Sequence, residues 1–117
     1  CPLFVGLNSQ QALRALRITM PRFIEKGRSI PRVALEDRVA YIVLDGEMEQ
    51  RGVIFGPGEI VLAEALVQET LVSDSTLTAV SDLHILMIRR NDFAELCDDD
   101  PDLGVLLYET VARLVSG

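Results

Sequence analysis

The sequence is poor in cysteine and has no long apolar run. Its two cysteines, Cys1 and Cys97, lie far apart, so we expect no disulfide framework and a cytoplasmic location, alone or as the cytoplasmic portion of a larger protein. No apolar run approaches the roughly 20 residues that cross a bilayer. The first residues also lack the charged and then apolar segments of an export signal. We therefore expect no membrane segment in this chain.

Basic residues are scarce as well. The chain has 11 Lys and Arg against 18 Asp and Glu, which gives a net charge of −7. Nucleic-acid binding depends on neutralising phosphates with Lys and Arg, so we expect no nucleic-acid partner. Residues 1–51 hold eight basic and six acidic residues (+2), whereas residues 52–117 hold three and twelve (−9). This asymmetry fits either a solvated acidic face or an acidic docking surface for a basic partner.

Patterns that mark catalytic or metal sites are missing too. The sequence has no Gly-x-Ser-x-Gly elbow and no phosphate-binding loop. Its one histidine, His84, lies in an apolar run without a second ligand nearby, and metal sites need several converging ligands. The acidic run 98–100 lacks the spaced oxygen ligands of a calcium loop. We expect a protein that is not an enzyme and holds neither a metal nor a cofactor.

What is present suits one domain. Its 117 residues, 49% of them hydrophobic, can form a sizeable core, and we expect residues 1–117 to form a single module. Asn8 and Gln11 have the spacing of a capping box, which predicts a short helix from about Ser9 to Arg17, ended by Pro21. Cys97 is expected to be a small apolar filler.

Residues 22–89 form short β-type runs separated by turn residues. The expected strands are 23–26, 29–33, 38–44, 47–49, 53–55, 76–80 and 83–88. Asp45-Gly46 and Gly56-Pro57-Gly58 mark turns, and residues 50–52 mark a tight hairpin. Many short strands with such turns predict a sandwich or barrel. Residues 64–67 are either one helical turn or a buried extended piece.

Two helices are expected at the end of the chain. Asn91 is placed to cap a helix through Cys97, and Asp100-Pro101 to start a helix to about Val115. The last helix has two apolar stripes, one of Leu103, Leu107, Val111 and Leu114 and one of Val105, Tyr108, Ala112 and Val115. A helix with this pattern is expected to be buried on two sides. The second stripe motivates the hypothesis of a homodimer through this helix.

The order of these elements resembles the cyclic-nucleotide-binding domain family, found in catabolite activator proteins and protein kinase A regulatory subunits. Five segments carry the resemblance over nearly the whole chain: Pro2–Leu7, Arg22–Gly27, Tyr41–Glu49, Phe55–Glu59 and Ser81–Phe93. The resemblance implies a mainly β fold. It would be an eight-stranded antiparallel β-roll, a jelly-roll or cupin-like barrel, with a short N-terminal helix and two C-terminal helices.

The resemblance is weakest at the ligand cassette. In the family, a Phe-Gly-Glu segment opens a short helix whose amides and Glu meet the cyclic phosphate and ribose, and a later Arg followed by Ser or Thr neutralises the phosphate. The nearest match to the first part is Leu62-Ala63-Glu64, in a register uncertain by one residue, and Ser73 and Asp74 match the second part. The resemblance thus places pocket positions at Glu64, Ser73 and Asp74.

This part of the sequence contains no cation. No Lys or Arg occurs between Gly52 and Ile88, a stretch that holds five acidic residues, and Arg51 lies outside the cassette. A hydrogen bond to a charged group contributes roughly 1.5–3 kcal/mol, and about 1.4 kcal/mol is a tenfold change in affinity. We therefore expect that ordinary cAMP and cGMP binding is lost. The chain is then a non-catalytic regulatory or interaction module that contacts a protein partner or the rest of a larger parent protein.

The alternative is a ligand-sensing regulatory domain that binds a cyclic nucleotide or another small molecule in the same pocket by a non-standard mode. Glu64, Ser73, Asp74 and Ser75 would then suit a neutral or cationic molecule rich in hydroxyl groups. The two hypotheses differ in the pocket behind Gly56-Pro57-Gly58. Aliphatic side chains from Leu62, Leu66 and Leu71 would fill it in an interaction module, whereas a sensor would keep it open and polar.

Overall fold

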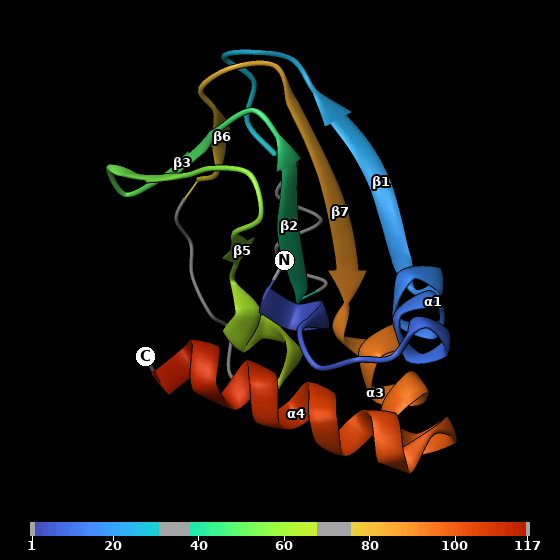
Figure 1. The fold of residues 1–117 in the computed structure, drawn as a ribbon. Helices are drawn as coiled ribbons and strands as arrows, with labels where there is room; N and C mark the ends of the chain where they lie inside the picture. The colour runs from blue at the N-terminus through green and yellow to red at the C-terminus, as the bar shows by residue number, and fades with distance from the viewer. Residues whose placement is uncertain (1, 31–37, 68–75, 117) are drawn as a thin grey trace.

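A computed structural model describes residues 2–30, 38–67 and 76–116 (Figure 1). Helices lie at both ends of the chain and strands between them. In chain order the elements are η1 (Pro2–Phe4), α1 (Ser9–Arg17), β1 (Thr19–Ile24), β2 (Val39–Asp45), β3 (Met48–Gln50), β4 (Val53–Phe55), β5 (Ile60–Val61), η2 (Ala63–Leu66), β6 (Thr78–Ala79), β7 (Leu83–Arg89), α3 (Arg90–Asp99) and α4 (Pro101–Ser116).

The strands form two antiparallel sheets. One has the order β1-β7-β2-β5 and the other β4-β3-β6, and a single bridge between Ser29 and Thr78 links the chain after β1 to the second sheet. The expected mainly β fold with one N-terminal and two C-terminal helices is confirmed. The described residues contain seven strands rather than eight. Their sheets do not close into a barrel: β5 is two residues long and lies at the edge of the four-stranded sheet, and β6, equally short, lies at the edge of the three-stranded sheet.

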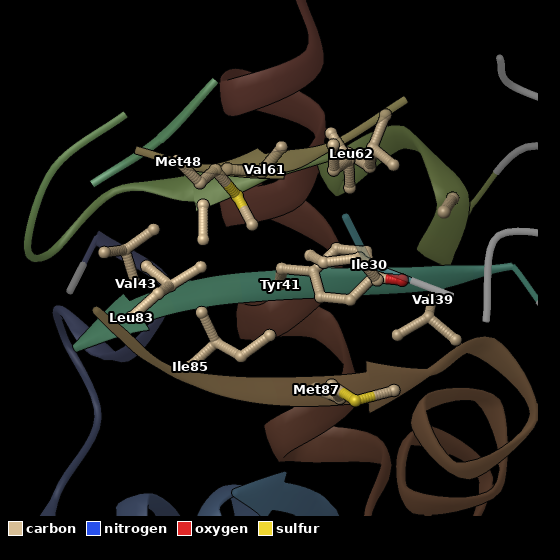
Figure 2. Packing of buried hydrophobic residues seen from close by; sticks show 13 residues of the cluster. Ile30, Val39, Tyr41, Val43, Met48, Val61, Leu62, Leu83, Ile85 and Met87 are labelled. Carbon is tan, nitrogen blue, oxygen red and sulfur yellow. The ribbon is translucent and has the colours of Figure 1, made fainter. Parts of the chain in front are cut away.

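The pairing of β2 with β7 divides the core in two. Side chains that alternate along a strand point to opposite faces of the sheet. One face of this pair looks into the roll between the two sheets, where Tyr41 belongs to the same buried cluster as Ile85 and Met48 (Figure 2). The buried roll core comprises Ile30, Val39, Tyr41, Val43, Met48, Val61, Leu62, Ala65, Leu77, Ala79, Leu83, Ile85 and Met87.

The other face of the sheet is covered by helices. α4 crosses below the strands, and α3 connects it to the end of β7 (Figure 1). The core of this helical layer comprises Leu3, Ala40, Ile42, Leu66, Ile88, Phe93, Cys97, Leu103, Leu107 and Val111. Cys97 is buried there, as expected of an apolar filler.

The predicted helix ends are mostly confirmed. The Asn8 side chain accepts from the Gln11 amide at 2.8 Å and the Asn8 amide donates to the Gln11 side chain at 3.0 Å, which completes the capping box of α1. At α4, the Leu103 amide donates to Asp100 Oδ1 at 3.3 Å. The prediction that Asn91 caps the helix before α4, which is α3, was wrong. β7 runs straight into α3, so extended Arg89 occupies the cap position without a side-chain bond.

Two further expectations need correction. The first strand begins at Thr19, not at Phe23, because β1 is an edge strand and can accommodate Pro21, which cannot donate a backbone hydrogen bond. α4 is buried on one side only within this chain. Its stripe at Leu103, Leu107 and Val111 is buried, whereas the second stripe is exposed, with Val105 57% and Tyr108 42% accessible.

Candidate functional site

The part of the predicted ligand cassette that the structure describes is a turn of 3₁₀ helix. This segment, η2, follows β5 and lies against α4 (Figure 1). Of the predicted pocket residues, Glu64 lies in η2 and is half-buried. Ser73 and Asp74 lie outside the described residues, as do Ser75 and Leu71.

The side chains around η2 belong to the two apolar cores. Leu62 is buried in the roll core beside Val61 (Figure 2), and Leu66 is buried in the core of the helical layer. Ala63 and Ala65 are buried as well, so Glu64 is the one polar side chain of η2. Two of the three leucines expected to fill the pocket of an interaction module are therefore packed in the protein interior.

The backbone at the start of η2 has an unusual conformation. Leu62 has φ 60° and ψ 40°, the left-handed region in which a side chain is disfavoured by roughly 1–2 kcal/mol. Glycine is the residue that adopts this conformation without strain. Burial of the Leu62 side chain opposes the strain. The sequence pattern could not show this feature, because an apolar residue before a helical turn does not specify its φ angle.

The nearest basic residue before the cassette lies at a hairpin tip. Arg51 and Gly52 both have positive φ, 51° and 80°, as a two-residue turn between β3 and β4 requires. This hairpin extends from the side of the roll (Figure 1). The position of Arg51 is thus fixed by the turn, and the described stretch from Gly52 to Val67 adds no further cation.

His84 lies on β7 between Leu83 and Ile85, which are part of the roll core, so its side chain is on the opposite face of the four-stranded sheet. Its ring packs on Phe23 with centroids 4.9 Å apart, and both side chains are exposed. With Pro21 and Leu44 they line a shallow groove across β1, β7 and β2. Among the described residues, no group of three or more His, Cys, Asp or Glu side chains is arranged to hold a metal ion.

No family model matches the sequence, and no curated protein matches it.

Among the helices of the described residues, none is long and apolar enough to cross a bilayer.

Solved structures resemble the chain over nearly its whole length. A cyclic nucleotide-binding domain from Methylobacillus flagellatus matches with a TM-score of 0.79 and 13% identity, covering 97% of this chain and 68% of its own. The Thermus thermophilus catabolite activator protein matches with a TM-score of 0.77 and 25% identity, covering 99% of this chain. The regulatory subunit of a cAMP-independent protein kinase A from Trypanosoma brucei matches with a TM-score of 0.77, 17% identity and 99% coverage.

The last two proteins are larger than the matched region. This chain spans 59% of the activator protein and 43% of the kinase regulatory subunit. The similarity therefore concerns one domain of each regulator. The order of elements, the two sheets and these matches agree with the resemblance seen in the sequence: the chain has the fold of the cyclic-nucleotide-binding domains.

Proposed function

We propose that residues 1–117 form one non-catalytic regulatory module of this fold that works in the cytoplasm, has lost ordinary cAMP and cGMP binding, and acts by contacting protein. The contact is with a separate partner or with the rest of a larger parent protein. One observation carries the proposal: no Lys or Arg occurs between Gly52 and Ile88, the stretch that includes the whole cassette. The Trypanosoma brucei protein, the regulatory subunit of a cAMP-independent protein kinase A, has the same fold and supports the idea that domains of this fold can serve kinases that do not depend on cAMP.

The missing cation has a direct energetic effect. A cyclic phosphate carries a negative charge, and moving it into a site without a counter-charge costs several kcal/mol. Glu59 and Glu64, from the described part of the cassette region, add negative charge there. Like charges repel, so a bound phosphate is less stable still.

The conformation of Leu62 also bears on the register of the cassette. Because left-handed backbone favours glycine, the register that sets Leu62 opposite the glycine of the family is the better of the two. In that register, Ala63 stands opposite the family's glutamate. The group that meets the ribose would then be missing as well, and Glu64 would lie one residue past its place.

Calorimetric titration with cAMP and with cGMP tests the proposal. We expect no heat of binding at micromolar ligand, and a micromolar dissociation constant for either nucleotide would refute the proposal. The double substitution Ser73→Arg with Asp74→Ser restores the family's residue types at the matched positions. If charge alone prevents binding, this variant should gain at least tenfold in affinity, the equivalent of about 1.4 kcal/mol.

A ligand held in a non-standard mode is the alternative outcome. Glu64, Ser73 and Asp74 would then bind a neutral or cationic molecule with several hydroxyl groups. Thermal-shift screening with polyols, nucleosides and amines separates the two proposals. A stabilising hit whose effect is lost in Glu64→Gln favours the sensor, whereas hits that the substitution leaves unchanged do not.

We also propose that the chain forms a homodimer through the exposed stripe of α4. Val105, Tyr108 and Val115 are exposed apolar residues on this helix, and the Tyr108 ring is held edge-on against Phe93 at 5.2 Å. Light scattering across a concentration series should show a dimer that Val105→Glu dissociates. Val53→Glu, a change at an equally exposed position on β4, is the control, and a monomer at high concentration contradicts the proposal.

A further inference from the structure

A groove lies on the outer side of the helical layer, between α3 and the junction of α1 with β1. α1 and α3 lie next to each other at the base of the sheet (Figure 1). Ile18 from the junction and Leu96 from α3 form its apolar lining, and both are half-buried at the edge of the helical-layer core. The floor of the groove is therefore fixed by the core beneath it.

Three carboxylates form the rim of this groove. Asp92, Glu95 and Asp99 occupy positions i, i+3 and i+7 of α3 and so line one side of the helix over about 10 Å. None of them makes an ion pair or a side-chain hydrogen bond with another residue in the described ranges 2–30, 38–67 and 76–116. Asp92 lies in the first turn of α3, where a negative charge is favourable. Glu95 and Asp99 repel each other at i,i+4 spacing, and Asp99 ends the helix, where a negative charge is unfavourable, so these two carboxylates do not benefit the isolated fold.

The facing helix forms no ion pair with the rim among the described residues. Of the two cations of α1, Arg14 is paired with Asp100 at the start of α4, and Arg17 makes no ion pair with Asp92, Glu95 or Asp99. A metal ion is not favoured either, because the described carboxylates are not grouped to hold one. The groove thus combines an apolar floor with uncompensated negative charge on one side.

We propose that this groove is the docking site for a helical segment of a protein partner that presents one leucine-sized side chain flanked by Lys or Arg. The apolar side chain would pack on Ile18 and Leu96, and the cations would pair with the rim carboxylates. A helix that carries basic residues at the same spacing matches the rim of α3 in length and in charge. This inference deepens the proposed function, on which it rests, by naming the kind of partner.

A designed peptide serves as the probe. It is a fluorescein-labelled amphipathic helix of leucine and lysine, about 14 residues or four turns long. Two control peptides replace either its lysines with glutamate or its leucines with serine. Fluorescence anisotropy with the full chain should show binding of the Leu/Lys peptide, loss of binding for the Glu peptide and at least tenfold weaker binding for the Ser peptide.

Matched protein variants locate the binding. The triple variant Asp92→Asn, Glu95→Gln, Asp99→Asn removes the charge of the rim without changing its shape, and we expect it to weaken binding at least tenfold. The control variant Glu47→Gln, Glu49→Gln, Glu59→Gln removes the same charge from exposed positions on the roll and should bind as the unaltered chain does. Circular dichroism checks that both variants fold.

Three results would overturn the inference: equal binding by the two triple variants, equal binding of the Leu/Lys and Leu/Glu peptides, or full binding of the Ser peptide. The first would show general attraction to an acidic protein. The nucleotide titration is independent of these measurements. If cAMP binds tightly while the rim variant still loses the peptide, the proposed loss of nucleotide binding fails and the docking groove stands.

Discussion

The two faces of the β2–β7 pair are covered in different ways. On the roll face, short strands and tight turns enclose an apolar core, and particular backbone conformations such as those of Gly46 and Leu62 hold the turns in place. On the helical face, one long helix supplies Leu103, Leu107 and Val111 as a continuous stripe. The described interior of the roll offers no cation to a ligand, whereas the outside of the helical layer is strongly charged. Under the proposed function, the protein is recognised at the surface of the helical layer and not in the pocket.

The largest effect on stability is expected when a side chain in the buried stripe of α4 is truncated. Leu107 is 1% exposed, so Leu107→Ala should lower the free energy of unfolding by about 2–5 kcal/mol, through lost burial and the cavity left behind. Val105 lies on the same helix but is 57% exposed. Val105→Ala should therefore change the free energy of unfolding by less than about 0.5 kcal/mol. Urea denaturation of both variants, at a protein concentration low enough to keep the chain monomeric, measures the contrast. Equal effects would mean that the two stripes of α4 are not distinct.

At the turns of the roll, substitutions should destabilise the protein through backbone strain and steric clash rather than through a cavity. Gly46 has φ 87°, and a Cβ there would lie 2.1 Å from the Asp82 carbonyl oxygen. Gly46→Ala should therefore destabilise the protein by about 2–4 kcal/mol, from left-handed strain and from the clash. Gly52 has φ 80° but open space around it, so Gly52→Ala should cost only about 1–2 kcal/mol. Indistinguishable urea midpoints for the two variants would remove the role assigned to close packing at this turn.

The thiol of Cys97 is buried in the core of the helical layer. Burial, and secondarily the charge of Asp98, raise the pKa of Cys97 from 9.0 to about 11. Because the folded state favours the neutral thiol, this contribution to stability is present below about pH 9 and is lost as the pH rises through about 11. In a Cys1→Ser variant, alkylation of Cys97 should be slow at pH 8 and still accelerate past pH 9. A rate that levels off near pH 9 would indicate an accessible thiol.

The smallest effect is expected at the ion pair between Arg14 of α1 and Asp100 at the start of α4. The hydrogen bond from Arg14 lowers the pKa of Asp100, and the amide of Leu103 lowers it further. A lowered carboxyl pKa stabilises the fold above about pH 4, and this effect is lost as the pH falls through the folded-state value. Arg14→Gln should raise the pKa of Asp100 towards its ordinary value, which carboxyl NMR titration detects. An unchanged titration would mean that the pair does not persist in solution.

Local signals in the sequence predicted much of the fold. The capping box at Asn8 and Gln11, the Asp100-Pro101 start of α4 and the hairpin at residues 50–52 all lie where they were expected, because each depends on neighbouring residues only. The predictions failed where a neighbour distant in the sequence decides. The cap assigned to Asn91 was wrong because β7 continues into the helix, and the first strand was placed too late because Pro21 was not expected at a sheet edge.

The sequence by itself determined the class of fold, the missing cations of the cassette and the acidity of the second half, since these follow from composition, order and local periodicity. Only the tertiary structure decided which apolar stripe of α4 is buried, that Leu62 adopts a left-handed conformation inside the roll core, and that Ile18 and Leu96 lie beside an unpaired acidic rim. Each of these depends on contacts between segments far apart in the chain. Burial and the pairing of charges are set by those contacts rather than by residue type.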